Sequence, residues 1–128
     1  MKIFSILLLV SFSLFAKNLN YIHDFNSAIS QAQISSKKVL MIYKSPTCGE
    51  CSRMENVVFK DKKLRDYLNK KFVLLKLDIT KDELPPGFTF IGVPTYFVLE
   101  PTGVEVAKLQ GSSPDAKIFL ERFQNHGL

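Results

Sequence analysis

Two cysteines, Cys48 and Cys51, lie three positions apart and are the only cysteines in the chain. An apolar segment, residues 39–43, precedes them, and a segment with helical spacing follows. A helix that begins at Cys48 directs its unpaired N–H groups and positive dipole end at the first sulfur, which favours the thiolate by roughly 0.3–1 kcal/mol. The spacing also allows a disulfide. It predicts thiol–disulfide exchange, with Cys48 as the exposed nucleophile and Cys51 as the more buried resolving thiol.

Residues 1–16 have the pattern of a secretory signal peptide, in which Lys2 precedes an apolar stretch with only three serines as polar members. Cleavage is expected after Ala16, although Leu14, three positions before the cleaved bond, is larger than the residue usually preferred there. The stretch is shorter than the ~20 residues of a transmembrane helix. An uncleaved anchor and a buried N-terminal helix are the alternatives. We expect residues 17–128 to form a mature domain exported to the periplasm, without a stable membrane span after cleavage.

Export affects how the cysteine pair is interpreted, because oxidising compartments also contain purely structural disulfides. A disulfide between Cys48 and Cys51 closes a very short loop, so it removes little entropy from the unfolded chain and is a weak crosslink. The spacing therefore favours a redox role. The first alternative is a non-catalytic binding or chaperone domain with a structural disulfide. The second is a zinc module, but His23 and His126 lie near opposite ends without ligand spacing, so no metal is expected.

The composition is that of one globular domain. The chain has 128 residues, of which 46% are hydrophobic and 11 are Phe, which is enough for a single core. The formal net charge is +5, and the basic residues are dispersed among acidic and apolar positions. A solvated helix face explains this dispersion better than a nucleic acid-binding surface. We expect a monomer that needs no cofactor and binds no nucleic acid.

Apolar periodicity and capping residues predict alternating helices and strands. In chain order these are a helix capped by Asp24, a strand at 39–44, a helix from Cys48 with Met54, Val57 and Val58 facing inward, a helix capped by Asp61, a strand at 72–78, strands at 95–100 and 104–110, and a helix capped by Ser113. The first two strands should be joined by a parallel crossover and the last two by a hairpin turn. The expected fold class is α/β, with a four-stranded mixed sheet flanked by helices on both faces.

This order of elements, with Cys-x-x-Cys at the first strand-to-helix junction and Gly92-Val93-Pro94-Thr95 before the hairpin, resembles the thioredoxin family. The resemblance covers residues 24–125. Within the superfamily, residues 48–55 and the segment 58–61 are more similar to exported thioredoxin-related proteins. They are similar also to the C-terminal domain of the bacterial membrane thiol reductase that feeds electrons to the periplasm.

The resemblance implies a thiol–disulfide oxidoreductase with Cys48 and Cys51 as its catalytic pair. It also implies that Pro94 follows a cis peptide bond and lies against the active-site disulfide, where the backbone of Val93 pairs with an incoming substrate strand. An ordinary proline at the start of a strand is the alternative interpretation of Pro94. The expected partners are exported proteins with disulfides or thiols and an upstream redox partner protein.

Several residues depart from the pattern of cytosolic thioredoxins. The chain has no Trp, and Thr47 precedes the first cysteine. Ile42 occupies the position of a buried Asp in those proteins, whereas the lysine that partners this Asp is matched by Lys76. The Cys51 proton must therefore pass to another acceptor, and the sequence leaves water, Glu50 and Glu55 open.

Gly49, Glu50 and Lys76 are candidates for tuning the redox couple. A carboxylate at position 50 lies between the cysteines, where its negative charge should raise the pKa of Cys48. A less stabilised thiolate makes the dithiol a stronger reductant, so we expect this protein to reduce its partners. The alternative is that Glu50 points into water and barely changes the potential.

Three apolar residues in the loop before Pro94 have two interpretations. Phe88, Phe90 and Ile91 are either covered by the core or form an apolar docking surface for partner polypeptides. The sequence favours the covered core.

Overall fold

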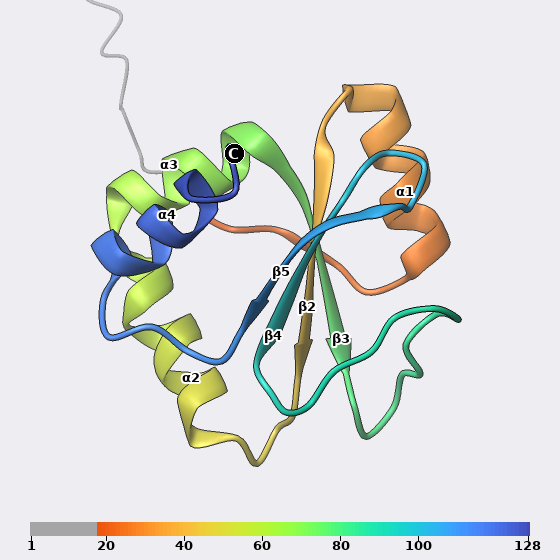
Figure 1. Ribbon diagram of the computed structural model, residues 1–128. Coiled ribbons are helices and arrows are strands. Elements are labelled where there is room, and N and C mark those ends of the chain that lie inside the picture. Colours follow the sequence, from red (N-terminus) through yellow and green to blue (C-terminus); the bar gives the residue numbers. More distant parts are fainter. Residues whose placement is uncertain (1–17) are drawn as a thin grey trace, which may run out of the picture.

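The computed structural model describes residues 18–128, so the predicted signal peptide at 1–16 lies outside the described residues. A central sheet lies between helices (Figure 1). The elements are β1 (Tyr21–Ile22), α1 (Phe25–Ser35), β2 (Lys38–Lys44), α2 (Gly49–Asn56), the 3₁₀ helix η1 (Val58–Lys60), α3 (Lys62–Lys71), β3 (Phe72–Asp78), β4 (Thr95–Leu99), β5 (Glu105–Gln110) and α4 (Ala116–Gln124). No helix within 18–128 is both long enough and apolar enough to cross a membrane.

The strands are ordered β1-β3-β2-β4-β5 in one mixed sheet. β1, β3 and β2 run parallel, whereas β4 and β5 pair antiparallel to β2 and to each other. The predicted α/β class, the parallel crossover and the hairpin are therefore confirmed. The strand count of four was wrong, because the two residues of β1 add an edge strand opposite Leu74 and Leu75. Two residues are too few to show the alternation by which a strand is recognised in a sequence.

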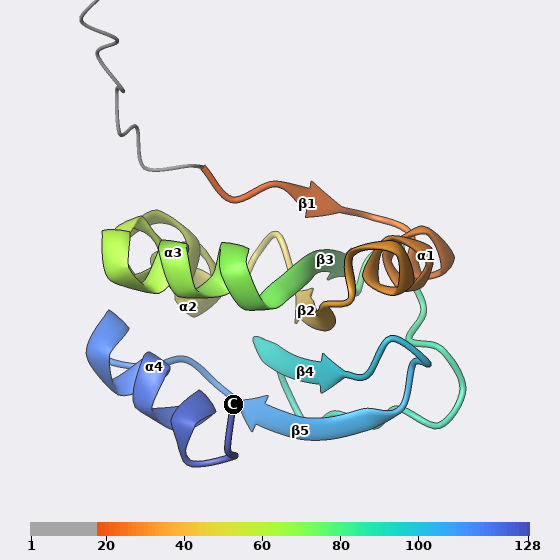
Figure 2. The same ribbon diagram turned by 90° about the horizontal axis from the view of Figure 1, so that it is seen from above.

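Helices cover both faces of the sheet, with α1 on one side and α2, α3 and α4 on the other (Figure 2). Alternate side chains of the strands enter two separate cores. Leu40, Ile42 and Tyr96 pack toward α2, α3 and α4, while Val39, Met41 and Phe97 pack toward α1. β2 is buried on both faces, which explains its continuous apolar run and fixes the position of the chain that follows it.

Three helices begin at an aspartate that accepts a hydrogen bond from the backbone three residues later. Asp24 and Asp61 cap α1 and α3 as predicted. The prediction of Ser113 as the cap of the last helix was wrong, because Asp115 has extended backbone geometry and accepts from the Ile118 N–H.

The predicted inward orientation of Val57 was also wrong. Its side chain is 63% exposed, whereas Met54 and Val58 are buried. α2 ends at Asn56 and the chain tightens into η1, so the helical phase that would bring Val57 to the core is interrupted.

Candidate active site

The redox centre begins where β2 leaves the sheet. A short turn follows the strand, in which the Thr47 N–H donates to the Ser45 hydroxyl at 3.3 Å and the Cys48 N–H donates to the Ser45 carbonyl oxygen at 3.3 Å. Cys48 is then the N-cap of α2. The buried strand and the bonded turn together hold the first sulfur at the positive end of the helix, as predicted.

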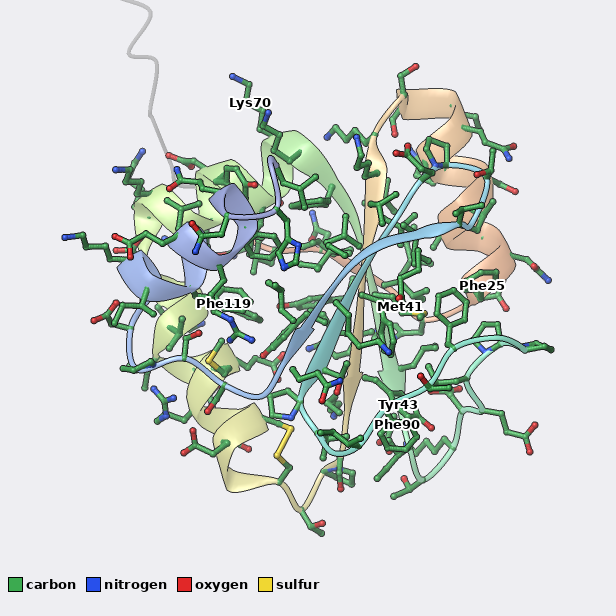
Figure 3. The ribbon with its side chains drawn as sticks, in the orientation of Figure 1. Phe25, Met41, Tyr43, Lys70, Phe90 and Phe119 are labelled. Atoms are coloured by element: carbon green, nitrogen blue, oxygen red, sulfur yellow. A yellow bond between two sulfur atoms is a disulfide. The ribbon has the colours of Figure 1, made fainter. Side chains whose placement is uncertain are left out.

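Cys48 and Cys51 form a disulfide, with their Cα atoms 5.2 Å apart. Figure 3 shows this bond at the start of α2. The Cys51 N–H also points at the Cys48 sulfur, at 3.1 Å. Cys48 is partly exposed, whereas Cys51 is 7% exposed. This difference in access matches the predicted order of nucleophile and resolving thiol.

The loop before β4 lies against the disulfide. The Val93–Pro94 peptide bond is cis, as the resemblance implied. The Cys48 sulfur lies 3.8 Å from the Val93 carbonyl oxygen. The Pro94 carbonyl oxygen in turn accepts from the Gly111 N–H at 2.8 Å, which joins this loop to the end of β5. The Val93 carbonyl group is thus a polar neighbour of the first sulfur.

A small cavity of about 10 Å³ lies behind Cys51, large enough for about one water molecule. The residues around it are Ile42, Lys44, Cys51, Glu55, Phe59, Lys76, Pro94 and Tyr96. The Glu55 carboxylate forms an ion pair with the Lys76 ammonium group, whose side chain is 13% exposed. In the sheet, Ile42 of β2 is opposite Lys76 of β3, so the lysine has an apolar neighbour at this side of the cavity. This side of the disulfide therefore has a carboxylate, but it comes from α2 rather than from β2.

Two tyrosines surround the same ion pair. The Lys76 nitrogen lies 3.6 Å from the centroid of the Tyr21 ring. Burial raises the pKa of Tyr21 and of Tyr96 well above the usual range, and the negative charge of Glu55 adds to both shifts. Both phenols are therefore protonated at neutral pH.

The Cys48 side of the disulfide has a second, exposed cluster. Arg53 donates to the Glu50 carboxylate through Nη2 at 3.0 Å and through Nε at 3.3 Å, and the Ser112 hydroxyl donates to the same carboxylate. The hydrogen bonds from Arg53, and then that from Ser112, lower the pKa of Glu50. Sequence reasoning missed both partners. The three-residue spacing of Glu50 and Arg53 could have indicated the first, but nothing local indicates Ser112.

Three comparisons with known proteins agree with this geometry. A family profile of the thioredoxin-like domain matches residues 25–126. A candidate disulphide-isomerase from Bacteroides thetaiotaomicron superposes with a TM-score of 0.74 at 29% identity, covering 85% of this chain and 91% of that one. The C-terminal domain of DsbD from Neisseria meningitidis, in its oxidised form, shares the fold with a TM-score of 0.65 at 18% identity, covering 84% of this chain and 99% of that one.

The chain belongs to the thioredoxin-like family. Its paired cysteines and the family match support thiol–disulfide oxidoreductase activity. A protein disulfide-isomerase from Hordeum vulgare is 28% identical over 82 residues, which are 63% of this chain and 16% of that protein. The chain thus spans a small part of the length of this curated relative.

The loop before Pro94 gives this thioredoxin-like domain an open apolar groove. Phe88 packs into the core, with its ring centroid 5.5 Å from that of Phe97. Phe90 is 41% exposed and packs edge-on against Tyr43 (Figure 3), while Ile91 is 89% exposed. A groove of about 350 Å³ beside the disulfide is lined by Ile91, Gly92, Val93, Pro94, Gln110 and Gly111. The favoured prediction of a covered core was therefore wrong for Phe90 and Ile91, whereas Phe88 is partly buried against the core.

The last candidates from the sequence are the histidines, which were considered as metal ligands, and Gly49. The Nδ1 atom of His23 lies 3.2 Å from the Lys76 carbonyl oxygen, which can accept a hydrogen bond from it. Residues 18–128 of the thioredoxin-like domain contain no cluster of three or more His, Cys, Asp or Glu side chains that could hold a metal. A Cβ atom at Gly49 would meet no heavy atom within 4 Å, so packing does not require glycine between the cysteines.

Proposed function

We propose that this protein is an exported thiol–disulfide oxidoreductase that reduces disulfides in partner proteins through the Cys48/Cys51 couple. The observation that carries the proposal is the asymmetric disulfide. Its first sulfur is partly exposed at a helix N-terminus beside the Val93 carbonyl, and its second sulfur is buried behind it. An accessible attacking group and a protected resolving group are what a two-step exchange requires.

In the first step, the Cys48 thiolate attacks one sulfur of the partner's disulfide. A mixed disulfide forms, and the other partner sulfur leaves as a thiolate that takes up a proton. The Cys51 thiolate then attacks the Cys48 sulfur, the mixed disulfide breaks, and the second partner thiol leaves. The partner gains two electrons and two protons, and the Cys48–Cys51 disulfide forms. An upstream dithiol protein must return two electrons and two protons to this disulfide before the next cycle.

We assign the Cys51 proton to Glu55 rather than to Glu50. Glu55 borders the cavity that Cys51 also borders, whereas the Glu50 carboxylate is engaged by Arg53 and Ser112 on the outer side of α2. Lys76 pairs with the Glu55 carboxylate and orients it, so that it can accept a proton directly or through one water molecule. Glu55 would then do the work of the buried Asp that Ile42 replaces.

The partner's chain is proposed to lie in the groove beside Pro94. Its backbone would pair with Val93, and an apolar side chain next to the partner's cysteine would contact the exposed Ile91. Extended, partly unfolded segments with a disulfide fit these contacts better than a folded surface, because a backbone edge must be free to pair.

The proposed direction is reduction of the partner. An ionised Glu50 in the first turn of α2 offsets part of the positive helix end that would otherwise stabilise the Cys48 thiolate. Because Arg53 balances much of that charge, the effect is smaller than the sequence suggested. Equilibration with glutathione at pH 7 measures the potential; a value like that of DsbA, ≈ −120 mV, would contradict the proposed direction.

An insulin-reduction assay tests the function. We expect the mature protein, residues 17–128, to reduce insulin disulfides, and Cys48→Ser to fall to the uncatalysed rate. Cys51→Ser should accumulate a mixed disulfide with insulin, because the second step is blocked. Equal activity of Cys48→Ser and the parent would contradict the catalytic assignment and support the non-catalytic binding domain instead.

A further inference from the structure

The segment from the end of β5 toward α4, residues 110–114, passes beside α2 (Figure 1). Beyond the end of β5 it has no regular secondary structure, so its carbonyl groups need partners from elsewhere. Two guanidinium groups provide them. Arg122 donates to the carbonyl oxygens of residues 110, 111 and 112 at 2.7–3.2 Å, and Arg53 donates to those of residues 113 and 114 at 2.6 and 3.3 Å. Five consecutive carbonyl groups therefore accept hydrogen bonds from two side chains.

Arg53 differs from Arg122 because it belongs to the redox helix. It lies two residues after Cys51, and the same guanidinium group that binds the 113–114 carbonyl groups also binds Glu50, between the cysteines. Ser112 closes the cluster by donating to Glu50. Both members of this ion pair, Glu50 in the first turn of α2 and Arg53 in its last turn, thus contact the 110–114 segment.

The 110–114 segment also reaches the partner groove. The Gly111 N–H donates to the Pro94 carbonyl oxygen at 2.8 Å, and Gln110 and Gly111 form one wall of the groove. Arg53 belongs to the helix that carries the cysteines, and its hydrogen bonds to the backbone of this segment join that helix to the wall of the groove in which we place the partner.

We propose that Arg53 is a positioning residue of the redox centre, which fixes the 110–114 segment against α2 and neutralises Glu50 beside Cys48. The inference rests on the proposed role of Cys48 as nucleophile. It assigns two separable effects to one side chain. The charge of Arg53 favours the Cys48 thiolate, and the planar, forked geometry of its guanidinium group keeps the groove wall in place.

The electrostatic effect is tested by thiolate titration in a Cys51→Ser background, where Cys48 is the remaining thiol. The rate of iodoacetamide alkylation is followed from pH 4 to 10. Arg53→Met should raise the pKa of Cys48, because a cation is lost and Glu50 is left unpaired. We expect alkylation on the acidic side of the pKa to slow about threefold, as a rise of roughly half a unit requires. Arg53→Lys keeps the charge and should recover most of the rate.

The geometric effect is tested by insulin-reduction kinetics in the Cys51-containing protein. Both Arg53→Met and Arg53→Lys should raise KM several-fold, because an ammonium group cannot bind a carboxylate and two carbonyl oxygens in the same fork. The matched control is Lys62→Met, which removes the cation of another exposed intrahelical pair, with Asp66, from α3. The control should match the parent in both assays.

If Cys48 in Arg53→Met has the same pKa as in the parent, the electrostatic half of the inference is wrong. If Arg53→Lys has the same KM as the parent, the geometric half is wrong. If Arg53→Met does not fold, as circular dichroism would reveal, Arg53→Lys still decides the geometric half, and Arg53→Gln takes the place of Arg53→Met in the titration. Failure of the proposed function would be recognised differently, because insulin reduction would then not depend on Cys48. The alkylation assay does not require insulin-reducing activity, so it tests the inference independently.

Discussion

Glu50 and Glu55 lie on the same short helix and each pairs with a cation, yet their surroundings differ. Glu50 is 56% exposed at the side chain and binds Arg53 of its own helix. Glu55 is 42% exposed at the side chain and binds Lys76, which comes from β3 and is 13% exposed, beside the cavity behind Cys51. At 3.6 residues per turn, five positions rotate a side chain by about 140°, so the two carboxylates leave α2 on different sides.

This contrast separates the two halves of the exchange reaction. Glu50, the outer carboxylate, is exposed and paired with Arg53, so we expect it to act on Cys48 only weakly. Glu55, the inner carboxylate, lines the same cavity as Cys51, the thiol whose proton we propose it accepts. The position of a carboxylate near a sulfur therefore does not predict its effect on the thiol pKa, because that effect also depends on the cation that pairs with the carboxylate and on how exposed the pair is.

Introducing a carboxylate at Ile42 is the strongest way to challenge this contrast. Ile42 is 4% exposed and opposite Lys76, which already pairs with Glu55. Ile42→Asp should lower the free energy of unfolding at pH 7 by about 2–4 kcal/mol, because the introduced carboxylate is buried and the neighbouring Lys76 is already paired with Glu55. Urea unfolding measures the loss.

The control for this variant is Ile42→Asn, which introduces a side chain of the same shape as Asp but without its charge. Burial should raise the folded-state pKa of the introduced carboxyl group above its unfolded value, so the destabilisation is present at neutral pH and shrinks as the pH falls through that raised pKa. The stability deficit of Ile42→Asn should not shrink in this way. An Ile42→Asp variant as stable as the parent at pH 7 would show that the inner site has room for two carboxylates.

Removing the inner carboxylate should affect the second chemical step. Glu55→Gln should slow the attack of Cys51 on the mixed disulfide about tenfold at pH 7, because the proton must then pass to water. Rapid mixing with a chromogenic disulfide measures the lifetime of the mixed disulfide. Above the pKa of Cys51 the thiolate forms without help, so the rates of the variant and the parent should converge at high pH.

Glu50→Gln is the matched control, since it removes a carboxylate from the same helix on the outer side. Equal lifetimes of the mixed disulfide in Glu55→Gln and Glu50→Gln at pH 7 would remove the assignment of Glu55 as the proton acceptor. The failure of both variants to converge with the parent at high pH would instead indicate a general change in the position of Cys51.

The inner and outer sites also differ in what could be predicted from the sequence. The cysteine spacing, the buried strand before it and the caps at Asp24 and Asp61 depend on neighbours within a few positions, and the structure has all of them. The cis bond before Pro94 came from the family resemblance rather than from the residues themselves. The Glu50–Arg53 pair lies within one helical turn and was accessible to pattern reasoning.

Contacts between distant segments were not accessible in this way. Glu55 and Lys76 are 21 positions apart and Glu50 and Ser112 are 62 apart, and both contacts depend on how α2 packs over the sheet. β1 was missed because its pairing with β3 defines it, not its own two residues. Local patterns thus predicted where the cysteine pair lies, and tertiary packing decided which groups surround each carboxylate of α2.

The smallest effect is expected from the outer carboxylate alone. Glu50→Gln removes a negative charge near Cys48 but leaves Arg53, so the pKa of Cys48 should fall, by less than about half a unit because the pair is exposed and screened. Alkylation on the acidic side of the pKa should accelerate less than about threefold, and the gain should disappear near 1 M salt, where the screening length is ~3 Å.

The wild-type titration makes this prediction sharper. Because Arg53 and Ser112 hold the pKa of Glu50 below its ordinary value, we expect Glu50 to be ionised at neutral pH and to add no inflection to the Cys48 profile there. A rise in the pKa of Cys48 in Glu50→Gln would contradict an electrostatic effect of Glu50 on Cys48, and a fall of more than about half a unit would mean that Arg53 does not balance the outer carboxylate. The two carboxylates of α2 would then act on Cys48 and Cys51 with similar strength, and the division of work between them would be lost.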